Sequence, residues 1–118
     1  SVSLWQNREV NMTISIQDFS QIDLRVAVIT AAEEHPDADK LLVLKVDAGD
    51  GEKQLVAGIK THYSVEELVG KKIIVVNNLT PAVLRGVESN GMLLAARDGD
   101  DVVLVTTDKD VGPGSRVQ

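Results

Sequence analysis

The side chains best suited to metal binding lie in one short stretch, HPDAD, where His35 is followed by Asp37 and Asp39. Imidazole and carboxylate groups are common metal ligands, but a firm site needs further ligands at suitable spacing. None is evident, because His62 is distant in the chain and cysteine is absent. We therefore interpret the stretch as a polar loop whose aspartates hydrogen-bond to nearby backbone amides. We predict neither a metal site nor another cofactor.

The chain has no recognisable catalytic nucleophile. Without cysteine, a nucleophile would be one of several scattered serines, paired with His35 or His62. The Gly-x-Ser-x-Gly elbow of hydrolases and the Gly-x-x-x-x-Gly-Lys phosphate loop are both missing. A catalytic fragment is thus the least favoured hypothesis, and we expect a binding protein rather than an enzyme.

Positive charge is concentrated in the middle of an acidic chain, whose formal net charge is −6. Residues 1–52 carry four cations against ten acids, residues 53–97 carry six against three, and residues 98–118 carry two against five. Lys and Arg contacts to phosphate supply most of the non-specific affinity for nucleic acid. A solvated mixed surface accounts for the same composition. Charge alone therefore permits nucleic-acid binding without requiring it.

Short strands must position these side chains. The chain is one domain long, and its few aromatic residues leave the core to Val, Ile, Leu and Ala. Ser64 is a candidate helix N-cap and Gly70 a helix stop. Apolar, β-branched runs predict strands over residues 24–30, 41–46, 54–57, 72–76, 92–96 and 102–105, with a loop over 77–86. The prediction is an all-β, five-stranded barrel of the oligonucleotide/oligosaccharide-binding (OB) type, with a short helix between strands 3 and 4 and a C-terminal β extension.

The first residues have no clear periodicity, so we predict a leader or linker over residues 1–15 and one domain over residues 16–118. Met12 is a candidate start of that domain. No stretch approaches the ~20 apolar residues of a membrane helix, and no signal-peptide run is present. We expect a cytoplasmic protein with no membrane association.

The most informative stretch is LRGVESNGMLLAA, residues 84–96. Taken alone, it predicts a hairpin turn at Asn90-Gly91 followed by a strand of small residues. Five further motifs accompany it in one order: IDLRV (22–26), HPDADKL (35–41), VAGI (56–59), EELVGKK (66–72) and VNNL (76–79). Together these motifs resemble the tRNA-binding domain family over residues 16–118. That family includes the C-terminal appendage of many methionyl-tRNA synthetases, free-standing dimeric tRNA-binding proteins and the endothelial monocyte-activating polypeptide.

The resemblance implies a barrel that binds tRNA by its folded shape, with little sequence preference, in a homodimer or beside a methionyl-tRNA synthetase catalytic domain. Lys40 and Arg85 would contact phosphates. Asn78 and Ser89 would offer hydrogen bonds, and Met92 an apolar contact. The scarcity of aromatic rings favours structured RNA over single strands, which are usually bound by stacking.

One departure concerns the stretch LTPAVL, residues 79–84, which lacks the extra Lys or Arg that close relatives carry there. Fewer phosphate contacts imply a weak binder that relies on dimerisation or on a tethered synthetase. They also keep open an alternative function, as a protein-interaction or chaperone-like member of the same fold family.

Overall fold

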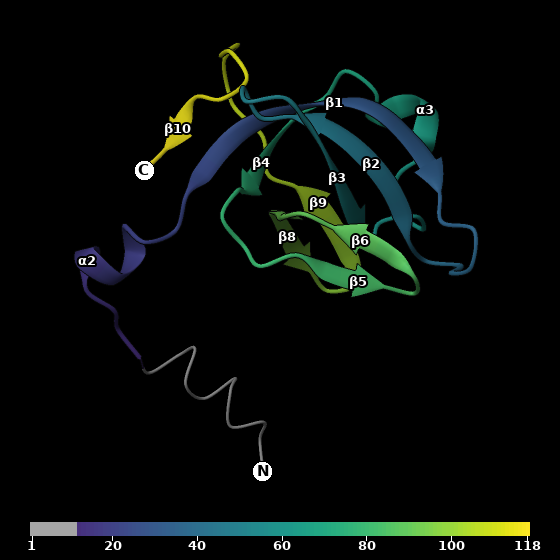
Figure 1. Ribbon diagram of the computed structural model, residues 1–118, viewed down its shortest axis with the longest axis horizontal. Coiled ribbons are helices and arrows are strands. Elements are labelled where there is room, and N and C mark those ends of the chain that lie inside the picture. Colours follow the sequence, from purple (N-terminus) through teal and green to yellow (C-terminus); the bar gives the residue numbers. More distant parts are fainter. Residues whose placement is uncertain (1–11) are drawn as a thin grey trace.

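The computed structural model describes residues 12–118, so residues 1–11 of the predicted leader or linker lie outside it (Figure 1). The described chain enters the domain through α2 (Ile16–Phe19), which begins where the Ser15 side chain accepts a hydrogen bond from the Asp18 amide. This helix buries none of its residues and lies to one side of the barrel in Figure 1. The described helices, α2 and α3, have four residues each, far fewer than a bilayer-spanning helix requires.

One antiparallel sheet forms the barrel wall, with strand order β3-β2-β1-β4-β7. The long strand β1 (Leu24–Glu34) pairs with β4 along its first half and with β2 along its second. A shift of register between Ile29 and Ala31 separates the two halves, and such a bulge bends a strand and increases its twist. The other strands are β2 (Leu42–Asp47), β3 (Glu52–Ala57), β4 (Lys72–Val76) and β7 (Met92–Leu93), with β10 (Arg116–Val117) beside the start of β1.

Two hairpins complete the barrel. One consists of β5 (Ala82–Leu84) and β6 (Val87–Ser89), and the other of β8 (Ala95–Asp98) and β9 (Asp101–Leu104). The end of β6 is fastened to β3, because Gln54 Nε2 donates to the Glu88 carbonyl and the Asn90 amide donates to the Gln54 carbonyl, both at 2.8 Å. These bonds close the gap between β3 and β7.

The core fills the barrel with aliphatic side chains from every wall strand. Between β3 and β4, α3 (Val65–Leu68) places the fully buried Leu68 in this core. Ser64 and Glu67 form a reciprocal capping box, and the Ser64 amide bonded to Glu67 lowers the pKa of that carboxyl. The largest buried side chains are Ile29, Leu42, Leu44, Leu55, Leu68 and Ile73.

The predicted OB-type barrel and the helix between strands 3 and 4 are confirmed, including the Ser64 cap. Three local predictions are wrong. The predicted loop over residues 77–86 contains β5 and the turn of a hairpin, and the predicted strand 92–96 is divided at Leu94. Asn90-Gly91 is not a hairpin turn either, because the flanking strands β6 and β7 pair with β5 and β4 and not with each other. Gly91 passes close to β4: a Cβ there would lie 2.9 Å from the Val76 carbonyl oxygen.

Candidate nucleic-acid interface

The β5–β6 hairpin presents Arg85 at its tip. Leu84 pairs with Val87, so the turn consists of Arg85 and Gly86 alone, with φ of 53° and 87°. Positive φ at both central positions is typical of type I′ turns, which favour Asn, Asp or Gly. Arg85 is the one non-glycine residue with positive φ in residues 12–118. This left-handed backbone conformation costs a non-glycine residue about 1–2 kcal/mol. An arginine in it therefore points to a functional role for the side chain.

The hairpin tip (residues 84–86) contacts the loop that joins β1 to β2, the 35–41 loop. His35 is only 4 % exposed; its Nδ1 accepts the Asp37 amide at 2.9 Å, and its Nε2 lies 3.0 Å from the Leu84 carbonyl oxygen. Because Nδ1 is an acceptor, the ring proton belongs on Nε2, which donates to Leu84. Arg85 Nη2 donates to the Asp37 carbonyl at 3.0 Å. Loop and hairpin tip therefore form one edge, on the right in Figure 1.

Both cations predicted to contact phosphate belong to this edge. Lys40 is exposed in the 35–41 loop, and Arg85 is exposed above Asp37 of the same loop. Phosphate binding requires cations that approach a backbone without obstruction. The structure thus brings together two residues that are 45 positions apart in sequence.

The other predicted site residues have different environments. Met92 is 49 % exposed on β7. Ser89 is 5 % exposed, and its hydroxyl accepts the Val56 amide and donates to the Gly91 carbonyl, both at 3.0 Å. Asn78 is exposed, but its side chain is hydrogen-bonded within the protein: Oδ1 accepts the Asp23 amide at 2.9 Å, and Nδ2 donates to the Gln21 carbonyl at 2.7 Å. Direct tRNA contacts by Asn78 and Ser89 remain predictions. Their contacts within the protein attach the two ends of the 77–91 segment, to residues 21–23 and to β3 respectively.

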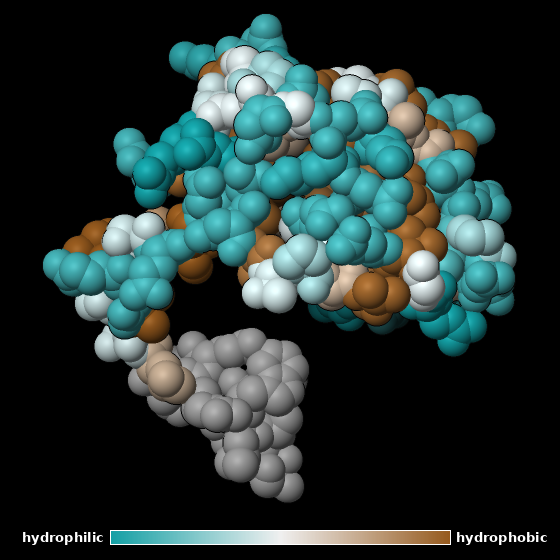
Figure 2. Space-filling view, in the orientation of Figure 1, coloured by the Kyte–Doolittle hydropathy of each residue, from teal (hydrophilic) through white to brown (hydrophobic). Residues whose placement is uncertain are grey.

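Apolar side chains are exposed on the hairpin and next to it. Val83 is the most exposed of them, at 68 %. Figure 2 shows hydrophobic surface at the lower edge of the barrel, in the region of the β5–β6 hairpin. We call these residues the hairpin apolar surface: Leu79, Val83, Leu84 and Met92.

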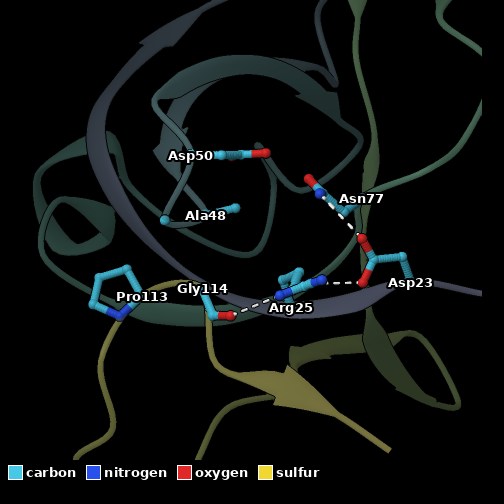
Figure 3. Close-up of a pocket in the computed structure, with 8 residues that line it drawn as sticks. Asp23, Arg25, Ala48, Asp50, Asn77, Pro113 and Gly114 are labelled. Atoms are coloured by element: carbon cyan, nitrogen blue, oxygen red, sulfur yellow. Dashed lines mark hydrogen bonds and ion pairs between the residues drawn. The ribbon is translucent and has the colours of Figure 1, made fainter.

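At the other end of β1, polar side chains line an open pocket of about 380 Å³ (Figure 3). Arg25 Nε donates to Asp23 Oδ1 at 2.6 Å, and Arg25 Nη1 donates to the Gly114 carbonyl at 3.1 Å. The Arg25 hydrogen bond lowers the pKa of Asp23, and a second one from Asn77 adds to it. Asp23, Arg25 and Asn77 thus hydrogen-bond to one another. The bond from Arg25 to Gly114 connects the start of β1 to the C-terminal segment.

Comparison with known families assigns the domain. Residues 24–116 match the family described as "Putative tRNA binding domain". This chain belongs to the tRNA-binding domain family. The match confirms the resemblance carried by the six motifs, and tRNA binding is what the family implies.

Relatives of known sequence and structure agree with this family. A 104-residue segment is 54 % identical to methionine–tRNA ligase of Thermotoga maritima, covering 88 % of this chain and 16 % of the ligase. The chain therefore spans about a sixth of the length of that relative. The crystal structure of the "MetRS related protein" from Pyrococcus horikoshii superposes with a TM-score of 0.85 at 37 % identity, covering 91 % of this chain and 99 % of that one.

The CsaA chaperone protein from Picrophilus torridus is similar in structure as well. Its TM-score is 0.83 at 38 % identity, over 90 % of this chain and all of that one. The chain is therefore similar both to proteins named for methionyl-tRNA synthesis and to a protein named as a chaperone.

The sequence analysis missed His35 as a residue of this interface. The sequence suggests His35 as a metal ligand or as the partner of a serine nucleophile, yet both of its ring nitrogens bond to protein atoms. Its partner, the Leu84 carbonyl, is 49 residues away in a segment that the sequence predicts as a loop, so no sequence pattern indicates the contact.

Proposed function

We propose that the chain is a non-catalytic domain that binds tRNA with little sequence preference. It would serve as a C-terminal or β-subunit module of a methionyl-tRNA synthetase, or as a stand-alone homodimer that delivers tRNA to one. The observation that carries the proposal is the family match over residues 24–116. Protein synthesis takes place in the cytoplasm, so the proposal places the protein there.

In this proposal Lys40 and Arg85 bind phosphates along the edge formed by the 35–41 loop and the hairpin tip. Both are exposed, and they sit on elements joined by the Arg85–Asp37 hydrogen bond. Met92 and its apolar neighbours contact sugar or base surfaces, while Asn78 and Ser89 support the segment between them. Recognition through phosphate and shape is suited to a folded RNA.

Two cations give only modest affinity for phosphate, because each contact contributes a limited, salt-sensitive term. Tethering the domain to a synthetase, or pairing two copies, raises the effective concentration of the second contact. The proposed second copy would cover apolar side chains that are exposed on α2, on the residues before it, and on and just after β9: Met12, Ile14, Ile16, Val103 and Val105.

A chaperone-like or protein-interaction role is the second candidate. The hairpin apolar surface favours it, since exposed apolar patches often mark protein contacts. The structural similarity to the Picrophilus torridus chaperone favours it as well.

A gel-shift assay with bulk tRNA at low and moderate salt separates these two functions. We expect the full chain to retard tRNA at low salt, with weaker binding as salt rises. Arg85→Ala should weaken this binding, and Lys109→Ala, which removes an exposed cation from the acidic C-terminal segment, should not. Failure to bind tRNA at low salt would reject the tRNA function and favour the protein-interaction role.

A further inference from the structure

We infer that His35 is a positioning residue of the tRNA-binding edge: its imidazole holds the hairpin tip on the 35–41 loop and thereby orients Arg85. The inference rests on the proposed function for its consequence in binding. Its structural basis is the pair of hydrogen bonds from His35 to Asp37 and Leu84.

The hairpin tip needs such support. β5 is exposed at all three residues, and an isolated two-stranded hairpin is at best marginally stable in water. The base of the hairpin is fixed to β3 through Ser89 and Gln54. Within residues 12–118, the tip makes two hydrogen bonds outside its own hairpin, from His35 to Leu84 and from Arg85 to Asp37. Its position therefore depends on the 35–41 loop.

Three hydrogen bonds form a closed circuit between the 35–41 loop and the hairpin tip. His35 joins the Asp37 amide to the Leu84 carbonyl, and Arg85, the next residue, returns to the Asp37 carbonyl. The His35 ring is almost fully buried and its two bonds are partly buried, where hydrogen bonds are stronger than in water, whereas the Arg85–Asp37 bond is exposed. Loss of the imidazole would release the Leu84 carbonyl and the Asp37 amide together. Within residues 12–118, the exposed Arg85–Asp37 bond would then be the one hydrogen bond left between the loop and the hairpin tip.

A fixed hairpin tip matters because of what Arg85 must do. A guanidinium has five N–H donors in a rigid plane, and the bond to Asp37 uses only Nη2. The remaining donors can meet a phosphate in a preset orientation, so less conformational entropy is lost on binding. His35 touches no RNA in this arrangement and acts through Arg85.

A double-mutant cycle tests the inference. The tRNA affinity and its salt dependence are measured for the unmodified chain, His35→Leu, Arg85→Ala and the double variant. If His35 acts through Arg85, His35→Leu weakens binding and lowers the salt slope by up to the ~0.9 unit of one phosphate contact. The double variant then binds no more weakly than Arg85→Ala alone. Additive losses, or an unchanged salt slope in His35→Leu, would overturn the inference.

Two controls separate positioning from general loss of stability. Val46→Ala removes buried methyl groups from β2, away from the hairpin, and should lower the melting temperature while leaving the salt slope unchanged. His35→Gln keeps one donor and one acceptor on a side chain of similar reach, so it should recover part of the affinity lost in His35→Leu. Equal losses of salt slope in Val46→Ala and His35→Leu would overturn the positioning role.

A measurement without RNA keeps this inference distinct from the proposed function. Amide hydrogen exchange at Asp37 and at residues 84–89 should be faster in His35→Leu than in Val46→Ala, because only the former frees the hairpin tip. If the two variants exchange alike there, the positioning role is rejected. If the unmodified chain does not bind tRNA, the proposed function is rejected, and the exchange measurement still decides whether His35 holds the hairpin.

Discussion

Arg85 occupies a backbone conformation that suits asparagine better than arginine. The substitution Arg85→Asn therefore separates the turn from the charge. We expect equal or greater stability, by up to about 1 kcal/mol, because the left-handed conformation becomes easier to adopt. Affinity for tRNA should fall, whereas Arg85→Lys, which keeps the charge without the planar set of donors, should keep part of it. Thermal melting and a tRNA titration measure both effects, and unchanged affinity in Arg85→Asn would remove Arg85 from the interface.

Gly91 is a second residue at which structure and function can be separated. The sequence leaves open two roles, a backbone requirement or room for an approaching RNA. In the structure, a Cβ at Gly91 would lie 2.9 Å from the Val76 carbonyl oxygen and 3.1 Å from Leu55 Cδ2. The space beside Gly91 is thus filled by the barrel itself.

We therefore expect Gly91→Ala to lower the free energy of unfolding by about 1–3 kcal/mol, as overpacking of a filled site does. The tRNA affinity of the folded variant should change little. Urea unfolding and a tRNA titration of the same preparation distinguish the roles. Normal stability with weakened binding would instead support close approach of RNA at Gly91.

The β5–β6 hairpin is the element that carries most of the proposed interface, and Ser89 fastens it to β3. Ser89→Ala would remove the acceptor of the buried Val56 amide. We expect a loss of about 1–3 kcal/mol in stability, the cost of an unsatisfied buried donor. The control is Ser115→Ala, which removes an exposed hydroxyl bonded only to the local Gly112 carbonyl. If Ser89→Ala weakens tRNA binding with no loss of stability, Ser89 is a direct contact instead.

The barrel strands could be predicted from sequence because their aliphatic runs end in clear turn residues, as at Asp47–Gly51. The hairpin could not, because its strands have three residues each and its turn, Arg85-Gly86, lacks the usual Asn-Gly pair. The chain's Asn-Gly pair, at residues 90–91, instead connects β6 to β7, which do not pair with each other. Likewise the motif resemblance selected Arg85 and Lys40, but only the tertiary contacts placed His35 against the hairpin tip that carries Arg85.

At the scale of the whole molecule, exposed apolar side chains near α2 and at β9 are the basis for a second copy. We expect sedimentation at micromolar concentration to give roughly twice the 12.7 kDa chain mass. Val103→Lys should shift the equilibrium toward monomer, because it places a charge in the apolar contact. Lys45→Ala, on the exterior of β2, is the matched control. A monomer throughout that range would reject the homodimer and favour the synthetase-appended form.

The acidic net charge of −6 makes localised cations essential to the account, since the molecule as a whole repels nucleic acid. The most direct test is the salt dependence of tRNA affinity in the unmodified chain and in Lys40→Ala/Arg85→Ala. If each cation binds one phosphate, the slope of log K against log salt should fall by about 1.8 units, with folding unchanged. The same slope and affinity in both proteins would contradict the proposed edge.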